Sequence, residues 1–261
     1  MRVLNSYILH LKRSIWFFTT FANLMENDTI KKGKALEIIY QDDYLVAVNK
    51  PHGMLVHRTK IALDADELAL QILRDQIGAY LFPVHRLDRK TSGVLIFALD
   101  RATARLLQKQ IMEHSIQKIY RAIVRGFFPS GVISVDYALT NDRGKTQEAL
   151  TRFELLDKVE IDLLFGQHNT SRYSLIEARP KTGRMHQIRK HLNHLRYPII
   201  GDRPHGCNKQ NKLFKEKWGM TTMMLHACEW IGEHPISKEP LHLKADLSSE
   251  FLRVKKILGF R

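Results

Sequence analysis

The sequence predicts an α+β fold built on a mixed or mostly antiparallel sheet. Strand-like segments, in which apolar and polar residues alternate, are spread over most of the chain, and helical segments interrupt them at irregular intervals. This order differs from the regular strand–helix alternation of a parallel α/β fold. With 261 residues, 44% of them hydrophobic, the chain is long enough for one large domain or two small ones.

The individual elements follow from local patterns of apolar residues and turn signals. Alternating or short apolar runs predict strands at 36–40, 44–48, 94–99, 118–126, 132–139, 149–156, 173–178, around 224–227 and at 241–244. Apolar residues spaced three or four apart predict helices at 66–77 and 101–114, from about 184 to 196, and at 248–258. Asp64 or Asp66 is expected to cap the first helix and Gly78 to end it.

The first 35 residues are expected to form an N-terminal extension, with the folded domain at 36–261. An apolar run at 14–25 follows Lys12 and Arg13 and faintly resembles a signal peptide, but no small-residue cleavage site follows it. This run is shorter than the ~20 residues that a membrane-spanning helix needs. We therefore expect the extension to be poorly ordered, or to precede a true start at Met25, and the protein to be cytoplasmic.

The charge balance indicates a polyanionic partner. Lys and Arg number 41 against 27 Asp and Glu, which gives a net charge of +14. A basic chain of this kind most often binds nucleic acid, although a merely basic soluble protein is the plainer alternative.

The two cysteines do not form a disulfide framework. Each follows a histidine two residues earlier, as His205 precedes Cys207 and His226 precedes Cys228. Four such side chains could ligate zinc, but their spacing is not that of a zinc finger or ribbon. We expect no metal, and we interpret Cys228 as a small buried residue.

The segment 84–93 is the most informative in the chain. Asp88 is its only carboxylate, and His85, Arg86, Arg89 and Lys90 surround it. Such positive neighbours favour the ionised form of a carboxylate, which is the form that acts as a nucleophile or a base. A charged turn that precedes a strand is the alternative without catalysis.

The residues of this segment closely resemble the active-site motif of the ribosomal large-subunit pseudouridine synthase A family. They read His-Arg-Leu-Asp-x-x-Thr-Ser-Gly at 85–93. Three further segments resemble other motifs of that family: Asn-Lys-Pro-x-Gly at 49–53, Lys-x-Tyr-x-Ala-x-Val-x-Gly at 118–126 and Thr-Gly-Arg-x-His-Gln-Ile-Arg at 182–189. The resemblance runs from about residue 36 to about 251. It implies one catalytic domain with the pseudouridine synthase fold, a long bent central sheet surrounded by helices and loops.

The resemblance also implies catalytic roles. Asp88 would act at the ribose, and Arg189, with Arg184 as second choice, would pair with it. Tyr120 would stack on the uracil and take the C5 proton, although a tyrosine on a buried strand face usually belongs to the core. The reaction breaks the N-glycosidic bond of uridine and rejoins the base through C5, with no net redox change or hydrolysis, so no cofactor or metal is expected.

Substrate binding is expected from basic side chains in the same motifs. Arg86 would fill the gap that the flipped uridine leaves in its helix. The other predicted substrate-binding residues are His85, Lys50, Arg184, His186 and Lys118. For Lys50 a solvated surface position is an equal alternative to a phosphate contact.

Several functions remain open on the sequence alone. The resemblance is strongest to the tRNA-modifying branch of the family and implies isomerisation of uridine 65 of tRNA by a monomer. The same chemistry on large-subunit ribosomal RNA and a non-catalytic RNA-binding module are alternatives. Hydrolysis of free nucleosides is disfavoured because such a substrate would not require a charge of +14.

Overall fold

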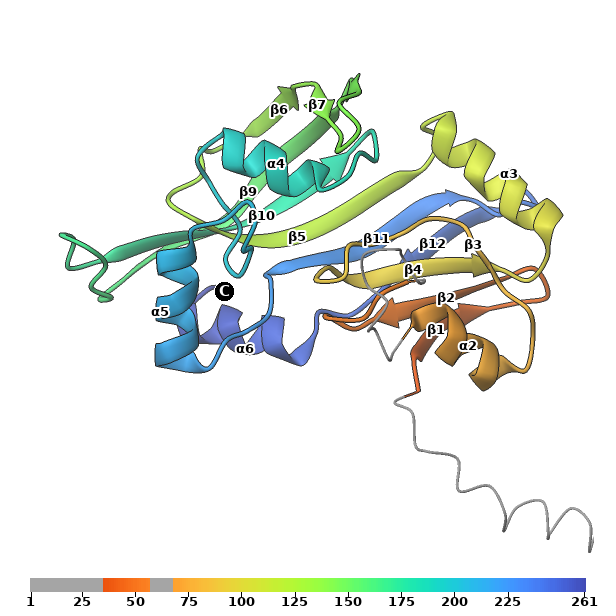
Figure 1. Cartoon of the computed structure of the whole chain (residues 1–261), viewed down its shortest axis with the longest axis horizontal. Coiled ribbons are helices and arrows are strands. Elements are labelled where there is room, and N and C mark those ends of the chain that lie inside the picture. Colours follow the sequence, from red (N-terminus) through yellow and green to blue (C-terminus); the bar gives the residue numbers. More distant parts are fainter. Residues whose placement is uncertain (1–34, 57–67) are drawn as a thin grey trace, which may run out of the picture. The chain divides into compact units, whose positions relative to one another are not determined.

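The computed structural model describes residues 35–56 and 68–261 of the chain (Figure 1). The chain divides into two units, Met1–Ala35 and Leu36–Arg261, and the elements described below belong to the second unit. The expectations for residues 1–34 and for the caps Asp64 and Asp66 lie outside the described residues. In the described part, no helix is long and apolar enough to cross a membrane.

A large mixed sheet organises the second unit. Its strands follow the order β1-β2-β4-β11-β5-β10-β9-β6, with β3 paired to β4 and β12 to β11. Within this sheet only β4 and β11 pair in parallel, so the predicted α+β class with a mostly antiparallel sheet is confirmed. The strands are β1 (Glu37–Gln41), β2 (Leu45–Lys50), β3 (Phe82–Pro83), β4 (Ser92–Ala98), β5 (Gln117–Arg125), β6 (Val132–Asp136), β9 (Leu150–Ile161), β10 (Ser171–Pro180), β11 (Leu225–Glu233) and β12 (Pro240–Lys244).

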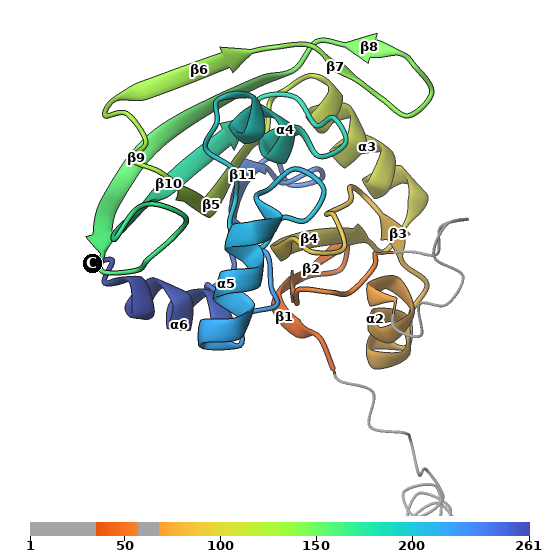
Figure 2. The same cartoon turned by 60° about the vertical axis from the view of Figure 1, so that its left-hand side comes forward.

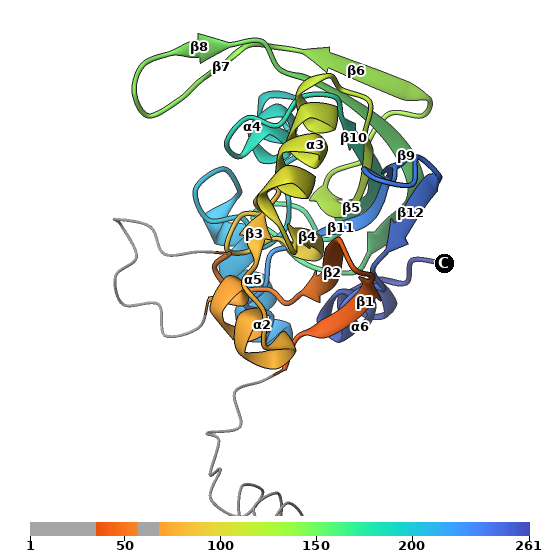
Figure 3. The ribbon, with the colours of Figure 1, turned by 90° about the vertical axis from the view of Figure 1, so that its right-hand side faces the viewer.

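The sheet is curved, and its second half arches over a helix. β9, β10 and β6 bend around α4 (Gln187–His194) in Figure 2, and Figure 3 places α4 and α3 (Arg101–Met112) on this same concave side. A separate two-stranded hairpin, β7 (Leu139–Thr140) with β8 (Thr146–Gln147), extends from the strands above α4.

The helices begin and end at residues suited to these positions. Asp100 and Ser248 accept hydrogen bonds from backbone N–H groups at the starts of α3 and α6 (Ser249–Leu258). Gly78, in the left-handed conformation, ends α2 (Ala69–Ile77), as the sequence predicts. The helix α5 (Asn208–Trp218) is not predicted from the sequence, because most of its residues are polar and it buries only Gln210 and Phe214 completely.

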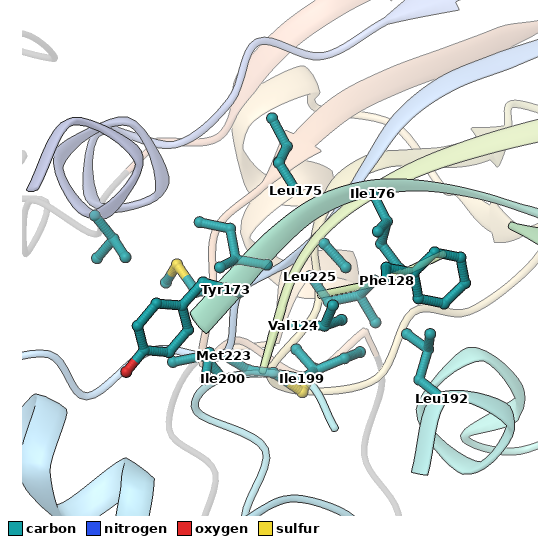
Figure 4. Close-up of a cluster of buried hydrophobic side chains, with 14 of the residues drawn as sticks. Val124, Phe128, Tyr173, Leu175, Ile176, Leu192, Ile199, Ile200, Met223 and Leu225 are labelled. Carbon is teal, nitrogen blue, oxygen red and sulfur yellow. The ribbon is translucent and has the colours of Figure 1, made fainter. Parts of the chain in front are cut away.

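The buried strand β4 separates two hydrophobic clusters. Side chains alternate across a strand, so Val94 and Ile96 pack with α3 and β12, while Leu95 and Phe97 pack with α2. The largest cluster lies further along the sheet and joins β5 and β10 to α4, α5 and α6 (Figure 4). Tyr120 on β5 packs against this large cluster and also against the cluster next to α2.

Gly93 allows β4 to approach β11 closely. A Cβ atom at this position would lie 2.1 Å from the carbonyl oxygen of Ala227, and the backbone has a φ of +108°. Only glycine suits both conditions. Ala227 pairs in turn with Tyr120 on β5. The glycine that ends the Asp88 segment therefore places that segment next to the strand that carries Tyr120.

Candidate active site

Asp88 lies in the loop between β3 and β4 and forms an ion pair with α4. Its Oδ2 accepts a hydrogen bond from Nη1 of Arg189 at 2.9 Å. The side chain of Asp88 is 21% exposed, whereas that of Arg189 is 5% exposed. The two residues are 101 positions apart in the chain. The carboxylate therefore faces accessible space while its cationic partner is fixed in the protein interior.

Asp202 holds Arg189 in this orientation. Arg189 donates from Nε and Nη2 to the two carboxylate oxygens of Asp202, at 2.7 and 2.8 Å. Burial alone would lower the pKa of Arg189, but its hydrogen bonds and ion pairs with Asp202 and Asp88 outweigh burial and raise that pKa. The guanidinium is thus a fixed cation that uses a two-pronged contact to one carboxylate and a single contact to the other.

A pair of histidines completes the surroundings of Asp88. His186 adopts a left-handed backbone conformation, with a φ of 57°, immediately before α4. Its Nε2 lies 3.8 Å from Oδ2 of Asp88, and its Nδ1 lies 2.9 Å from Nε2 of His205. Burial lowers the pKa of both histidines, which favours the neutral form of each ring. Left-handed backbone is uncommon outside glycine and often occurs at functional sites.

Tyr120 lies between two alanines of the neighbouring strands. Ala178 of β10 and Ala227 of β11 are its partners in the sheet. Its side chain is half-buried and packs against two of the hydrophobic clusters. Burial and the charge of Asp88 raise the pKa of Tyr120, so its phenol stays protonated at neutral pH.

A cavity of about 530 Å³ connects these groups. A volume of this order is typical of sites that enclose a small molecule or a single nucleoside. The predicted site residues that line it are Asp88, Tyr120, Arg189, Arg86, His85, Arg184, His186 and Lys118. Eight of the nine predicted positions therefore come together, from the loop before β4, from β5, and from α4 with the turn that precedes it.

The side chains at the edge of the cavity differ in how many contacts with the protein hold them in place. Arg86 is exposed. Arg184 donates from Nε to the carbonyl oxygen of Glu148 at 2.9 Å, which fixes its direction. His85 accepts from the backbone N–H of Ile96 through Nε2, and burial lowers its pKa to about 4. His85 is therefore a neutral ring that ties the loop to β4.

Lys50 does not belong to this cavity. It is fully buried, and its Nζ donates to the carbonyl oxygens of Pro51, Met54 and Arg89 at 2.9, 3.0 and 3.3 Å. All three ammonium protons are used in this way, so none remains for a phosphate. The structure therefore corrects the predicted substrate contact of Lys50: this residue joins the turn after β2 to the loop that carries Asp88.

Two residues next to Asp88 and Arg189, Asp202 and His205, are not predicted as site residues from the sequence. Both come from the segment after α4, where Gly201-Asp202 follows an apolar run. An acidic residue with 1% exposure has to be paired, so a buried partner for an arginine could have been sought there. The sequence alone contains no sign that this partner is Arg189.

The His-x-Cys pairs do not form a metal site. His205 contacts His186, whereas His226 contacts Ser92 through Nδ1 at 2.8 Å on a different strand. Within residues 35–56 and 68–261, no group of three or more His, Cys, Asp or Glu side chains is arranged to hold a metal ion.

Comparisons with known proteins agree with this geometry. A family model described as RNA pseudouridylate synthase matches residues 44–194, a range that includes Asp88, Tyr120 and Arg189. Two solved structures have a similar fold. Human RNA Pseudouridylate Synthase Domain Containing 4 has a TM-score of 0.63 at 25% identity, with 85% of this chain and 92% of that chain covered. Human RNA Pseudouridylate Synthase Domain Containing 1 has a TM-score of 0.65 at 23% identity, with 82% and 84% covered, and supports the fold alone.

Curated relatives are more similar in sequence. The tRNA pseudouridine synthase C of Vibrio parahaemolyticus serotype O3:K6 is 47% identical over 224 residues, which cover 81% of this chain and 90% of the relative. The protein of the same name from Salmonella typhi is 43% identical over 237 residues, which cover 87% and 91%. From the family model and from relatives at this level of identity, we conclude that the chain belongs to the RNA pseudouridylate synthase family.

Proposed function

We propose that this protein isomerises a uridine of tRNA to pseudouridine, at position 65, the position that the sequence resemblance implies. Two lines of support are independent. Curated relatives at 43% to 47% identity are named tRNA pseudouridine synthase C. The carboxylate of Asp88, held by Arg189 in a cavity that Tyr120 also lines, is the observation that carries the proposal.

The chemistry assigned to Asp88 takes place at the ribose. The bond from C1′ to N1 breaks, the uracil turns, and a bond from C1′ to C5 forms, so that C5 loses one proton and N1 gains one. Asp88 either attacks C1′, as the nucleophile of a retaining glycosidase does, or removes a proton from C2′. Both routes need an ionised carboxylate with a fixed direction, which Arg189 and Asp202 provide.

Tyr120 is assigned to stacking on the turning uracil. Aromatic side chains commonly stack on extruded bases. The expectation that Tyr120 also takes the C5 proton stays a prediction.

Arg86 is assigned to a contact with the RNA helix from which the uridine is flipped. Its exposed guanidinium lies at the edge of the cavity, two residues before Asp88. A flipped uridine leaves an unpaired partner base and a gap in the helix, which a cationic planar group can fill. Activity as a monomer and in the cytoplasm remain predictions from the sequence.

The proposal is tested on tRNA and large-subunit ribosomal RNA transcripts in parallel. Each is incubated with the wild-type protein and with Asp88→Ala, and pseudouridine is mapped by carbodiimide-dependent stops of reverse transcription. We expect one new stop, at uridine 65 of tRNA, that is missing with Asp88→Ala. Stops on ribosomal RNA alone would overturn the tRNA assignment but keep the chemistry. Binding without stops on either RNA would favour the non-catalytic module.

A further inference from the structure

A second cavity adjoins the active site and is lined by basic side chains. It has a volume of about 340 Å³ and shares Lys118 and Pro180 with the active-site cavity. The basic residues around it are His114, Lys118, Arg152, Arg179 and Lys181, and no acidic residue is among the described residues that line it. The second cavity is thus a cationic extension of the first.

The second cavity lies where the pairing of β5 with β10 ends, beyond Tyr120 and Ala178. Arg152 of β9 and Arg179 of β10 are partners in the sheet. Tyr120 of β5 is the partner of Ala178, and Lys118 precedes Tyr120 by two residues on the same strand. Two residues of a strand span about 7 Å. Lys118 therefore lies about that distance beyond the residue assigned to stack on the uracil. Arg152 and Arg179, which are one residue out of step with Ala178, belong to the opposite face of the sheet.

Most of this positive charge is not neutralised within the protein. Arg179 is paired with Glu177 at 2.5 Å and lies 3.8 Å from Glu154. Among the described residues, Lys118, Arg152 and Lys181 form no ion pair with a carboxylate. Burial lowers the pKa of Lys118, so an unpaired ammonium is costly at this position. Cations gathered in this way repel one another, and a bound anion would relieve the repulsion.

We propose that this second cavity binds a phosphodiester group of the RNA strand next to the target uridine. The proposal rests on the proposed function, since it takes RNA as the substrate. A backbone phosphate suits the site because its charge complements the cations. A contact to a phosphate also does not depend on the base sequence of the RNA. The contact would position the strand while the flipped uridine occupies the active-site cavity.

The test compares single charge removals within and outside the cavity. Arg152→Gln and Lys181→Gln each remove one cation from the lining, and both side chains are exposed, so the fold does not depend on them. Lys158→Gln is the matched control. Lys158 is an exposed cation on β9, the same strand as Arg152, but it does not line the cavity. All three variants change the net charge equally.

Dissociation constants for a tRNA transcript are measured over a range of salt concentrations, together with kcat and KM for pseudouridine formation. We expect the slope of log K against log salt to fall by about 0.7 to 0.9 for each cavity variant but not for Lys158→Gln. At 0.1 M salt this corresponds to a Kd raised about five- to eightfold. KM should rise in parallel while kcat stays unchanged, which also shows that the variants are folded.

Equal slopes for the cavity variants and Lys158→Gln would overturn the phosphate site. A failure of the proposed function looks different. The wild-type protein could bind tRNA without forming pseudouridine while the slope of log K against log salt is still smaller for the cavity variants. In that case the proposed function is wrong and the phosphate site is still supported. If no salt-dependent binding of RNA is observed at all, both proposals fall.

Discussion

At the residue scale, the orientation of Asp88 depends on a residue that does not touch the cavity. Arg189 uses one nitrogen for Asp88 and two for Asp202. Asp202 has 1% exposure, and the side chain of Arg189 has 5%. Removal of Asp202 would leave a buried cation with a single partner and free to rotate. The direction of the Asp88 carboxylate is therefore set by an ion pair behind it.

Asp202→Ala should reduce both stability and activity. Breaking a buried ion pair by removing one partner costs about 3 to 5 kcal/mol, and a displacement of about 1 Å at a reacting group can cost about 100-fold in rate. Urea unfolding measures the loss of stability, and the kcat for pseudouridine formation measures the loss of activity. Asp142→Ala, in the exposed hairpin loop, is the control. Unchanged unfolding and kcat in Asp202→Ala would contradict the assigned role.

The sequence alone could name Asp88, Tyr120 and Arg189 as candidates, because each lies in a short contiguous motif, and the structure brings all three to one cavity. It could not assign Asp202, since its partner is defined by the path of the chain after α4. Lys50 shows the opposite error, because it was predicted to bind the substrate but does not line the cavity. Its position in a polar turn suggested a contact with RNA, but three backbone carbonyls converge on its ammonium only in the folded chain.

At the element scale, the parallel contact of β4 with β11 depends on Gly93. Gly93→Ala should lower the free energy of unfolding by more than about 2 kcal/mol, because the new Cβ would meet the carbonyl oxygen of Ala227. Gly144→Ala is the control that separates the effect of this clash from the effect of backbone strain. Gly144 also has a positive φ, of +75°, but nothing lies within 4 Å of the position that its new methyl group would take. Equal losses in urea unfolding of the two variants would contradict a steric role for Gly93.

The buried His226 gives this same contact a dependence on pH. Its Nδ1 lies 2.8 Å from the hydroxyl of Ser92 on β4, and its Nε2 lies 3.3 Å from the carbonyl oxygen of Ala245. A carbonyl oxygen only accepts, so Nε2 carries the proton and Nδ1 accepts from Ser92. Burial lowers the pKa of His226 from 6.5 to about 4.

The folded protein should therefore lose stability on acidification from pH 6.5 to 4. In this window the unfolded chain takes up a proton at His226 and the folded chain does not, so unfolding is favoured as the pH falls. The effect amounts to at most about 3 kcal/mol. Urea unfolding at pH 7 and pH 4.5 measures it. His226→Gln should show a smaller drop between the two pH values than the wild-type protein; an equal drop would be evidence against a neutral buried histidine.

Local patterns predicted most elements but not all of them. Most strands and amphipathic helices with a clear apolar period were predicted close to their observed bounds, but β9 and β11 extend at least five residues beyond the predicted ends, and the short strands β3, β7 and β8 were not predicted. The helix α5 was missed because its polar sequence lacks such a period and it buries only Gln210 and Phe214 completely. The parallel pairing of His226 with Ser92 joins segments 134 residues apart and leaves no local signal.

At the scale of the whole molecule, a curved sheet brings three hydrophobic clusters together around one cavity. Tyr120 packs against two of them, and the loop that carries Asp88 leads into β4, which contributes side chains to the two clusters on either side of it. The net charge of +14 complements RNA. The α+β class and a polyanionic partner could be predicted from composition and pattern, whereas the strand order and the curvature depend on long-range pairing.

The central claim is that Asp88, held by Arg189, isomerises uridine in tRNA. The most direct measurement uses a tRNA transcript whose uridines are tritiated at C5, because formation of the bond from C5 to C1′ releases that tritium to water. The wild-type protein should release it in proportion to the tRNA present. Asp88→Asn, which keeps the shape of the side chain, should bind tRNA equally but release tritium at least about 1,000-fold more slowly. Release by Asp88→Asn at the wild-type rate, or no release by the wild-type protein, would contradict the account.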